Sequence, residues 1–210
     1  MEREKFLELI KKRHTTRKFL PDSIPDEDVI YMAEAARLAP TAQNQQQWKF
    51  IAIRNKELIT KMAELVDEVT RFYGSKIPDE KSAQRLEKYK FYYLLFKEAP
   101  LVFVILGKQT DGFFQSLNEE FHLGAEKAVL ADPDILSLGG AIENMILAGT
   151  ALGYGSTWMT GPRIDQKKLE QLLEIEEPFH IVSLLAVGKP DRERSGPVKK
   201  ELNEIFRFID

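Results

Sequence analysis

The chain of 210 residues contains no cysteine. This absence excludes disulfide bonds, metal sites built from thiolates and a cysteine nucleophile, and it fits a reducing compartment. Long hydrophobic runs are also missing, since the longest, "PLVFVILG" at residues 100–107, is too short to span a bilayer. The N-terminal residues 1–12 are charged and amphipathic, without the apolar core of a signal peptide. We therefore expect a soluble, cytoplasmic protein.

A large excess of positive charge is absent as well. The net charge is -3 at pH 7, so the chain lacks the broad basic field that recruits nucleic acid or an anionic membrane. The sequence has no GxSxG, P-loop or GxGxxG signature. Its three histidines, His14, His122 and His180, lie far apart and at no metal-ligand spacing. We expect neither a metal site nor a nucleic-acid site, and any anion site must be built locally.

The spacing of the apolar residues predicts a single α+β domain over residues 1–210, with a central, mainly antiparallel or mixed sheet flanked by helices. Four segments are expected to form strands, at residues 48–54, 100–107, 154–159 and 180–188. Six are expected to form helices, at residues 2–13, 26–38, 56–73, 84–98, 137–153 and 165–174. The second strand is apolar throughout, which is typical of a strand buried on both faces. Residues 108–135 are the least regular part of the chain.

The segment "RHTTRKF", residues 13–19, places cations and hydroxyl groups at the end of the first expected helix. Arg13 and Arg17 lie four residues apart, with His14 and Thr15 between them. A phosphate group needs guanidinium, hydroxyl and free backbone N–H donors in one small volume, and this segment offers all three. A solvated helix end, favoured by the helix dipole, explains the same residues. The segment alone does not decide between the two interpretations.

Two further segments combine small, amide and glycine residues next to expected strands. Residues 39–50, "APTAQNQQQWKF", form an amide-rich loop that either contacts a planar polar heterocycle or only caps the preceding helix. Residues 153–163, "GYGSTWMTGPR", leave the amides of Met159, Thr160 and Gly161 at the end of a strand, where ligands often bind. Taken alone, this second segment is better explained as an ordinary turn between a helix and a strand, followed by a Gly-Pro pair that ends the strand.

In this order and spacing, the three segments and "SLLAVGKP" at residues 183–190 resemble the nitroreductase family of FMN-dependent oxidoreductases. The resemblance covers nearly the whole chain, although residues 67–98 and 108–135 contribute little to it. It implies a nitroreductase-like α+β fold that forms an intertwined homodimer, with one FMN per subunit at the dimer interface. The first segment then becomes a cradle for the FMN phosphate.

The resemblance also assigns contacts to individual positions of this chain. The FMN phosphate and ribityl chain would be held by four residues of the first segment: Arg13, His14, Thr15 and Arg17. The flavin would be reached from the neighbouring subunit by four residues of the amide-rich loop: Pro40, Thr41, Ala42 and Asn44. One side of the isoalloxazine, with an amide near flavin N5, would be lined by Trp158, Met159, Thr160 and Gly161. A further cation for the phosphate would come from Lys199 or Lys200.

In such an enzyme the flavin carries the chemistry, so no catalytic side chain is required. The resemblance implies ping-pong hydride transfer: NADH or NADPH, a transient electron donor, reduces flavin N5. A small electron-poor acceptor, such as a nitroaromatic or a quinone, then takes the electrons. The walls of the substrate pocket are expected from residues 108–135 and from an aromatic group that ordinary core packing explains at least as well: Phe91, Tyr92, Tyr93 and Phe96.

Two other interpretations of the same flavin site stay open. One is a reductive dehalogenase-like enzyme, in which Glu68, Tyr73 and Lys81 bind an amino-acid zwitterion instead of lying on a solvated helix surface. The other is a non-catalytic protein that binds FMN.

The chain also departs from the family pattern, because Gln47 stands where proline is common. In the apolar helix at residues 137–153, the charge of Glu143 needs a partner.

Overall fold

The fold is described by a computed structural model that covers residues 3–110, 120–121, 133–192 and 196–209. Four strands form one sheet in the order β1-β2-β4-β3, and every neighbouring pair is antiparallel. Their bounds are Trp48–Ile53 (β1), Leu101–Gly107 (β2), Gly155–Met159 (β3) and His180–Gly188 (β4). The predicted α+β class with a central antiparallel sheet is confirmed.

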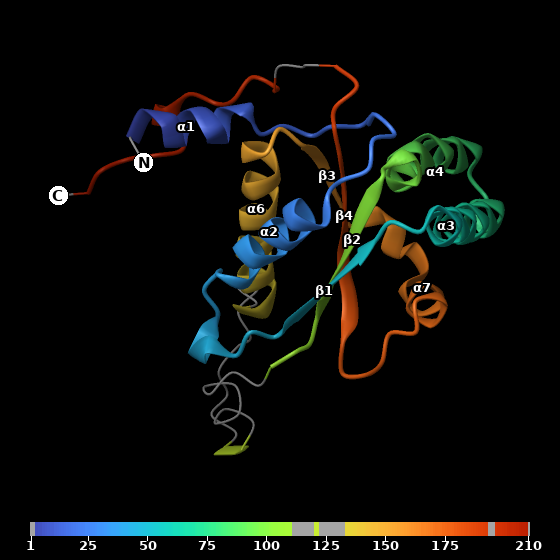
Figure 1. The fold of residues 1–210 in the computed structure, drawn as a ribbon. Helices are drawn as coiled ribbons and strands as arrows, with labels where there is room; N and C mark the ends of the chain where they lie inside the picture. Colours follow the sequence, from blue (N-terminus) through green and yellow to red (C-terminus); the bar gives the residue numbers. More distant parts are fainter. Residues whose placement is uncertain (1–2, 111–119, 122–132, 193–195, 210) are drawn as a thin grey trace.

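Helices cover both faces of the sheet (Figure 1). The α-helices are α1 (Arg3–Lys12), α2 (Asp26–Arg37), α3 (Lys56–Lys76), α4 (Glu80–Tyr93), α6 (Pro133–Ala151) and α7 (Gln166–Leu172). Short 3-10 turns are η1 (Ala42–Asn44), η2 (Leu95–Glu98), η3 (Gly161–Asp165) and η4 (Leu202–Glu204). Figure 1 shows α2 and α6 on one face and α3, α4 and α7 on the other, while α1 projects away from the sheet.

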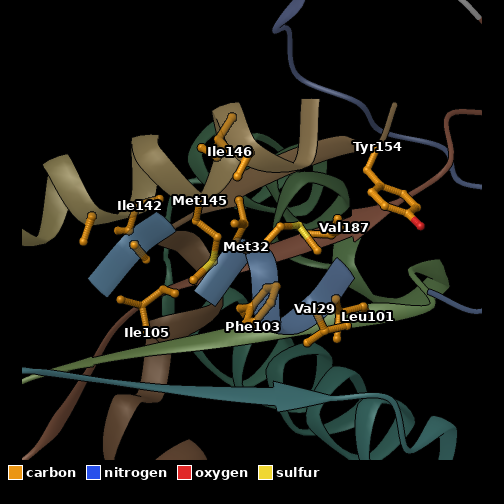
Figure 2. Close-up of a cluster of buried hydrophobic side chains, with 14 of the residues drawn as sticks. Val29, Met32, Leu101, Phe103, Ile105, Ile142, Met145, Ile146, Tyr154 and Val187 are labelled. Carbon is orange, nitrogen blue, oxygen red and sulfur yellow. The ribbon is translucent and has the colours of Figure 1, made fainter. Parts of the chain in front are cut away.

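The strand β2 lies at the centre of the core, and all of its residues are buried. Because side chains alternate along a strand, its residues divide between two clusters. The cluster shared with α2 and α6 takes Leu101, Phe103 and Ile105. The cluster shared with α3 and η2 takes Val102, Val104 and Leu106. Figure 2 shows the first cluster, with β2 side chains packed against those of the two helices. The expected burial of this strand on both faces is confirmed.

Small residues let α6 pack closely against α2. A Cβ atom added to Gly149 would come within 2.9 Å of Met32 Sδ, so the two helices approach closely there and any larger residue would require Met32 to shift. The end of α6 leads to Tyr154, whose hydroxyl donates to Asp28 Oδ2 over 2.6 Å. The hydrogen bond thereby joins the chain between α6 and β3 to α2. Figure 2 shows the ring of Tyr154 beside the first cluster.

Two helices differ from their expected ranges by a few residues: α6 begins at Pro133 instead of residue 137, and α3 ends at Lys76 instead of residue 73. The helix expected at residues 84–98 differs most. It begins earlier, at Glu80, because the side chain of Asp79 accepts a hydrogen bond of 2.7 Å from Ser82 N and caps the helix. It also ends earlier, at Tyr93, and the 3-10 turn η2 follows. Phe96, expected as a possible pocket wall, is fully buried in the core. Most of the 108–135 segment lies outside the described residues.

Two further observations concern only the residues that the structure describes. None of their helices combines the length and the hydropathy needed to cross a membrane. Their histidine, aspartate and glutamate side chains form no group of three or more that could hold a metal ion.

Candidate functional site

The chain that leaves α1 runs alongside the edge strand β3. Thr15 forms a parallel bridge with Ser156, and Thr16 N donates to the carbonyl oxygen of Ser156 over 2.8 Å. The hydroxyl of Thr157 in turn donates to the carbonyl oxygen of Thr16. The first segment of the sequence is therefore attached to the third, although about 140 positions separate them.

The same segment then passes the end of β4. Phe19 forms a bridge with Pro190, and Leu20 N donates to the carbonyl oxygen of Lys189 over 2.8 Å. A Cβ atom on Gly188 would come within 3.0 Å of Phe19, so the chain approaches closely there. Three of the four motifs that carry the family resemblance thus meet at one end of the sheet.

Burial along this segment alternates as expected for extended chain. Thr16 is only 5% exposed, whereas Thr15 and Arg17 on either side of it are exposed. A Cβ atom on Gly155 would overlap the Thr16 side chain, which explains the need for glycine in this part of β3. Because successive side chains of an extended segment point to opposite sides, the hydroxyl of Thr15 and the guanidinium of Arg17 face away from the core on the same side.

Arg13 makes a contact that the sequence did not indicate. Its Nε lies 3.5 Å from Glu143 Oε1 of α6, and both side chains are partly exposed. Glu143 therefore has a charged partner, and that partner is one of the expected phosphate ligands. Guanidinium has five N–H donors, so Arg13 can contact both the carboxylate and a further anion.

The remaining residues expected to contact the phosphate are His14, Lys199 and Lys200. His14 Nδ1 is 2.9 Å from the carbonyl oxygen of Lys12. A Cβ atom on Gly196 would lie 3.8 Å from His14 Cβ, so the C-terminal segment returns to this place. Lys199 and Lys200 follow shortly afterwards, and both are exposed.

At the end of β3, a ligand could reach the side chain of Trp158 but mainly the backbone of the residues that follow it. Trp158 is 45% exposed, but Met159 is 6% exposed and its side chain lies in the core cluster with α3. Any contact of Met159 with a ligand must therefore come from its main chain. The paired register of β3 with β4 ends at Met159, so Thr160 and Gly161 lie beyond the sheet. There the chain turns into η3, where Arg163 N donates to the carbonyl oxygen of Thr160 over 3.2 Å.

The amide-rich loop lies elsewhere in the same chain. Pro40, Thr41, Ala42 and Asn44 belong to the connection through η1 between α2 and β1. Figure 1 shows η1 at the opposite end of α6 from the segment that follows α1. One chain therefore does not bring the two sets of expected FMN contacts together.

The backbone of this loop is unusual. The φ angles of Gln43, Asn44 and Gln46 are 52°, 54° and 47°, in the left-handed region that residues with a Cβ seldom adopt. Thr41 Oγ1 accepts a hydrogen bond of 3.1 Å from Gln46 N and closes the loop. Strained backbone of this kind often occurs at ligand contacts. The composition of the loop signalled many donors and acceptors, but not this conformation.

Sequence reasoning missed how the end of α4 meets the site. The ring of Tyr93 covers the Cα of Gly161, and the ring centroid of Tyr92 lies 5.9 Å from Arg17 Cζ. For the aromatic residues of this region, the sequence predicts only a place in the pocket wall or in the core. Glycine directly before Pro162 was the one available sign that a neighbour approaches closely at that position.

A shallow depression elsewhere on the surface lies between α3 and α7, with Lys61, Glu68 and Lys168 among its lining residues. None of the expected FMN contacts lines it. The candidate site therefore remains the end of the sheet near Thr15 and Gly161.

Comparison with known proteins agrees with the motifs. The model of the nitroreductase family matches residues 10–189. A protein from Archaeoglobus fulgidus, named as a candidate NADH dehydrogenase/NAD(P)H nitroreductase, is 27% identical over 199 residues, which cover 91% of this chain and 88% of that protein. A solved BluB-like flavoprotein from Clostridium difficile 630 is 29% identical with a TM-score of 0.91, and 100% of both chains is covered. A solved oxidized iodotyrosine deiodinase, bound to FMN and 3-iodo-L-tyrosine, is 23% identical with a TM-score of 0.71, covering 97% of this chain and 98% of that one.

The family model spans most of the chain and includes the segments at residues 13–19, 39–50 and 153–163. The same strand order and helices place the first and third of these segments side by side. The chain belongs to the nitroreductase family of FMN-dependent oxidoreductases.

Proposed function

We propose that this protein binds FMN at the end of the sheet and uses NAD(P)H to reduce a small electron-poor acceptor of the nitroaromatic or quinone type. The observation that carries the proposal is the attachment of the Thr15–Thr16 backbone to Ser156 and Thr157. This attachment holds residues 13–17 beside the strand that leads to Trp158 and Gly161, which supports a single site for the FMN phosphate and one side of the flavin ring.

The donors on this surface fit a phosphate in their chemistry. Thr15 and Arg17 are both exposed, and Arg13, in the same short segment, has guanidinium donors beyond the one that faces Glu143. A charge-assisted hydrogen bond contributes about 1.5–3 kcal/mol. The anchored backbone of Thr16 holds these donors in place before a ligand arrives, which lowers the entropy cost of binding.

The remaining residues of the site bind and orient. FMN, when bound, supplies hydride transfer chemistry at its N5 atom. The backbone amides of Thr160 and Gly161 lie beyond the part of β3 that is paired with β4. They are therefore suited to donate a hydrogen bond to N5 at the edge of the flavin ring. Trp158, 45% exposed, offers an aromatic surface beside them. No side chain is assigned a proton transfer.

We also propose that a second copy of the chain completes the site. Large apolar side chains are exposed on α1, on α2 and along the C-terminal residues: Phe6, Leu7, Ile10, Ile30, Leu38, Val198, Leu202, Ile205, Phe206, Phe208 and Ile209. Figure 1 shows α1 and the C-terminal residues on the same side of the molecule, away from α3 and α7. Extended exposed apolar surface of this kind is typical of an interface. In such a homodimer, Pro40–Asn44 of each subunit reaches the flavin of the other.

The test is a visible spectrum of the purified protein, reconstituted with FMN and then reduced anaerobically with NADPH or NADH. Flavin absorption should bleach and then return when a nitroaromatic is added. The double variant Arg13→Ala/Arg17→Ala should lose FMN while its far-UV circular dichroism is retained. Its matched control, Lys61→Ala/Arg71→Ala, removes the same charge from the outer surface of α3 and should stay yellow.

Each outcome decides part of the proposal. No FMN uptake by the native protein would refute the flavin site. FMN uptake without bleaching would refute the reductase and leave a non-catalytic flavin protein. A double arginine variant that purifies with full FMN would refute the phosphate assignment alone.

The likeness to the iodotyrosine deiodinase supports a second candidate function, reductive dehalogenation of a halotyrosine. The residues proposed to bind an amino-acid zwitterion lie on α3 and at the start of α4, and all three are exposed: Glu68, Tyr73 and Lys81. Turnover of 3-iodo-L-tyrosine and of a nitroaromatic by the reduced protein separates the two candidates. Faster turnover of the iodotyrosine, reduced by Lys81→Ala, would favour dehalogenation.

A further inference from the structure

The last turn of α4 touches the proposed flavin site at two places. The ring of Tyr93 lies against Gly161 so closely that a Cβ atom on Gly161 would overlap the Tyr93 Cδ1 and Cε1 atoms. The preceding residue, Tyr92, places its ring 5.9 Å from Arg17 Cζ. Because successive helical residues point about 100° apart, one ring reaches the turn after β3 and the other reaches the cradle.

The turn after β3 needs such a support. Thr160 and Gly161 lie past the last paired residue, so the hydrogen bonds of the sheet do not fix them. Tyr93, in contrast, is anchored: it is half-buried and packs against the core cluster of α3, η2 and β4. A ring held by the core and pressed against a glycine outside the sheet limits where that stretch of main chain can lie.

The helix that carries the ring is itself fixed to α3. Lys90 Nζ, one turn before Tyr93, lies 3.0 Å from Asp67 Oδ1 of α3 and also contacts Glu87. Its side chain is 18% exposed, so this ion pair is better shielded than most surface pairs. The position of α4 relative to the sheet is therefore determined before it reaches Gly161.

We propose that Tyr93 is a positioning residue: its ring holds the Thr160–Gly161 main chain where a backbone amide meets the flavin. This inference rests on the proposed FMN site and adds to it the element that sets its geometry. Tyr93 meets the turn at Gly161 and is assigned no contact with the cofactor. The ring faces Gly161 with its edge carbons, so the hydroxyl has no part in this role.

The experiment compares Tyr93→Phe, Tyr93→Leu and the control Tyr89→Leu, all in the full-length protein. Tyr93→Phe keeps the ring, while Tyr93→Leu keeps apolar bulk in the core but removes the ring. Tyr89 lies on the same helix, is 47% exposed and packs its ring on Tyr92. Three quantities are measured: the dissociation constant of FMN from fluorescence quenching, the reduction potential of the bound flavin, and amide hydrogen exchange of residues 159–165 in the FMN-free protein.

We expect Tyr93→Leu to weaken FMN binding about tenfold, as when one hydrogen bond is misaligned. It should also shift the flavin potential and speed exchange in residues 159–165. Tyr93→Phe and Tyr89→Leu should stay within about twofold of the native protein in FMN affinity.

Native affinity, potential and exchange in Tyr93→Leu would overturn the inference. Faster exchange without any change in FMN affinity or potential would also overturn it, because the ring would then hold the turn without serving the flavin. If the native protein binds no FMN, the proposed function fails and this inference fails with it. Native FMN binding with an unaffected Tyr93→Leu variant refutes the positioning role alone.

Discussion

At the scale of single residues, Tyr154 shows how one side chain can join three elements. It is 8% exposed, and its hydroxyl donates to Asp28 at the start of α2. Burial, followed by the hydrogen bond to Asp28, raises the pKa of Tyr154 to about 12 from 10.0. The folded protein therefore favours the neutral phenol more strongly than the unfolded chain does.

This shift predicts a loss of stability in alkali. An unfolded tyrosine loses its proton near pH 10, whereas the folded one keeps it to about pH 12. Above pH 10 the unfolded state binds fewer protons than the folded state, so the free energy of unfolding falls as pH rises through this window. The contribution is fully present below about pH 10 and amounts to about 3 kcal/mol at most, because each pKa unit corresponds to about 1.4 kcal/mol.

Urea unfolding at pH values from about 8 to 12 measures the effect. Tyr154→Phe should lower the free energy of unfolding by about 1–3 kcal/mol at neutral pH, because Asp28 loses a donor. It should also flatten the decline between about pH 10 and 12. The control Tyr73→Phe alters an exposed tyrosine of α3 and should retain the native profile. An equally steep decline in Tyr154→Phe would contradict the assignment.

At the scale of elements, α3 depends on a cap at its first turn. The side chain of Asn55 accepts a hydrogen bond of 3.0 Å from Leu58 N and satisfies one of the unpaired amides there. We expect Asn55→Ala to lower the free energy of unfolding by about 1 kcal/mol and Asn55→Asp to preserve it, because aspartate is an equally good cap. Thermal unfolding should show a fall of about 2–4 °C for the alanine variant only. Equal melting temperatures for both variants would contradict the role of the cap.

The elements were the part of the fold that the sequence predicted best. The continuous apolar run of β2 and the alternating pattern of β1 were confirmed as strands. Periodicity works here because it reflects which faces are buried. It was misleading for α4, where the cap at Asp79 adds a polar first turn that carries no apolar pattern. A helix can begin wherever its first amides are satisfied, with or without a buried face.

The candidate site was predictable in its components and less so in its contacts. The order of the motifs predicted a phosphate cradle at residues 13–17, and the structure brings that segment beside β3. Its role in binding phosphate stays a prediction. The ion pair between Arg13 and Glu143 and the contact between Tyr93 and Gly161 were not predictable. Both join residues far apart in sequence, and local composition contains no information about such pairs.

At the scale of the whole molecule, the proposed dimer makes a direct prediction. The double variant Leu7→Glu/Ile10→Glu places charges on the exposed apolar side of α1. Sedimentation should give the native protein about twice the chain mass of 24.2 kDa and the variant a single chain mass. FMN should be lost with the dimer, because Pro40–Asn44 would no longer reach the flavin of the other subunit.

The control is Phe72→Glu on α3, which charges an exposed aromatic residue on the other side of the sheet. It should sediment like the native protein. A native protein that sediments as one chain and still binds FMN would contradict the shared site.

The order of the strands has a consequence for how this chain is made. Among the described strands, no two partners are joined by a hairpin: residues 54–100 separate β1 from β2, residues 108–179 separate β2 from β4, and residues 160–179 separate β3 from β4. Closing such long loops slows folding. On the ribosome, β2 emerges after β1, α2 and α3 but long before β4. The edge of β2 that pairs with β4 must therefore wait until nearly the entire chain has been translated. We expect this strand to be the segment of the nascent chain that chaperones shield.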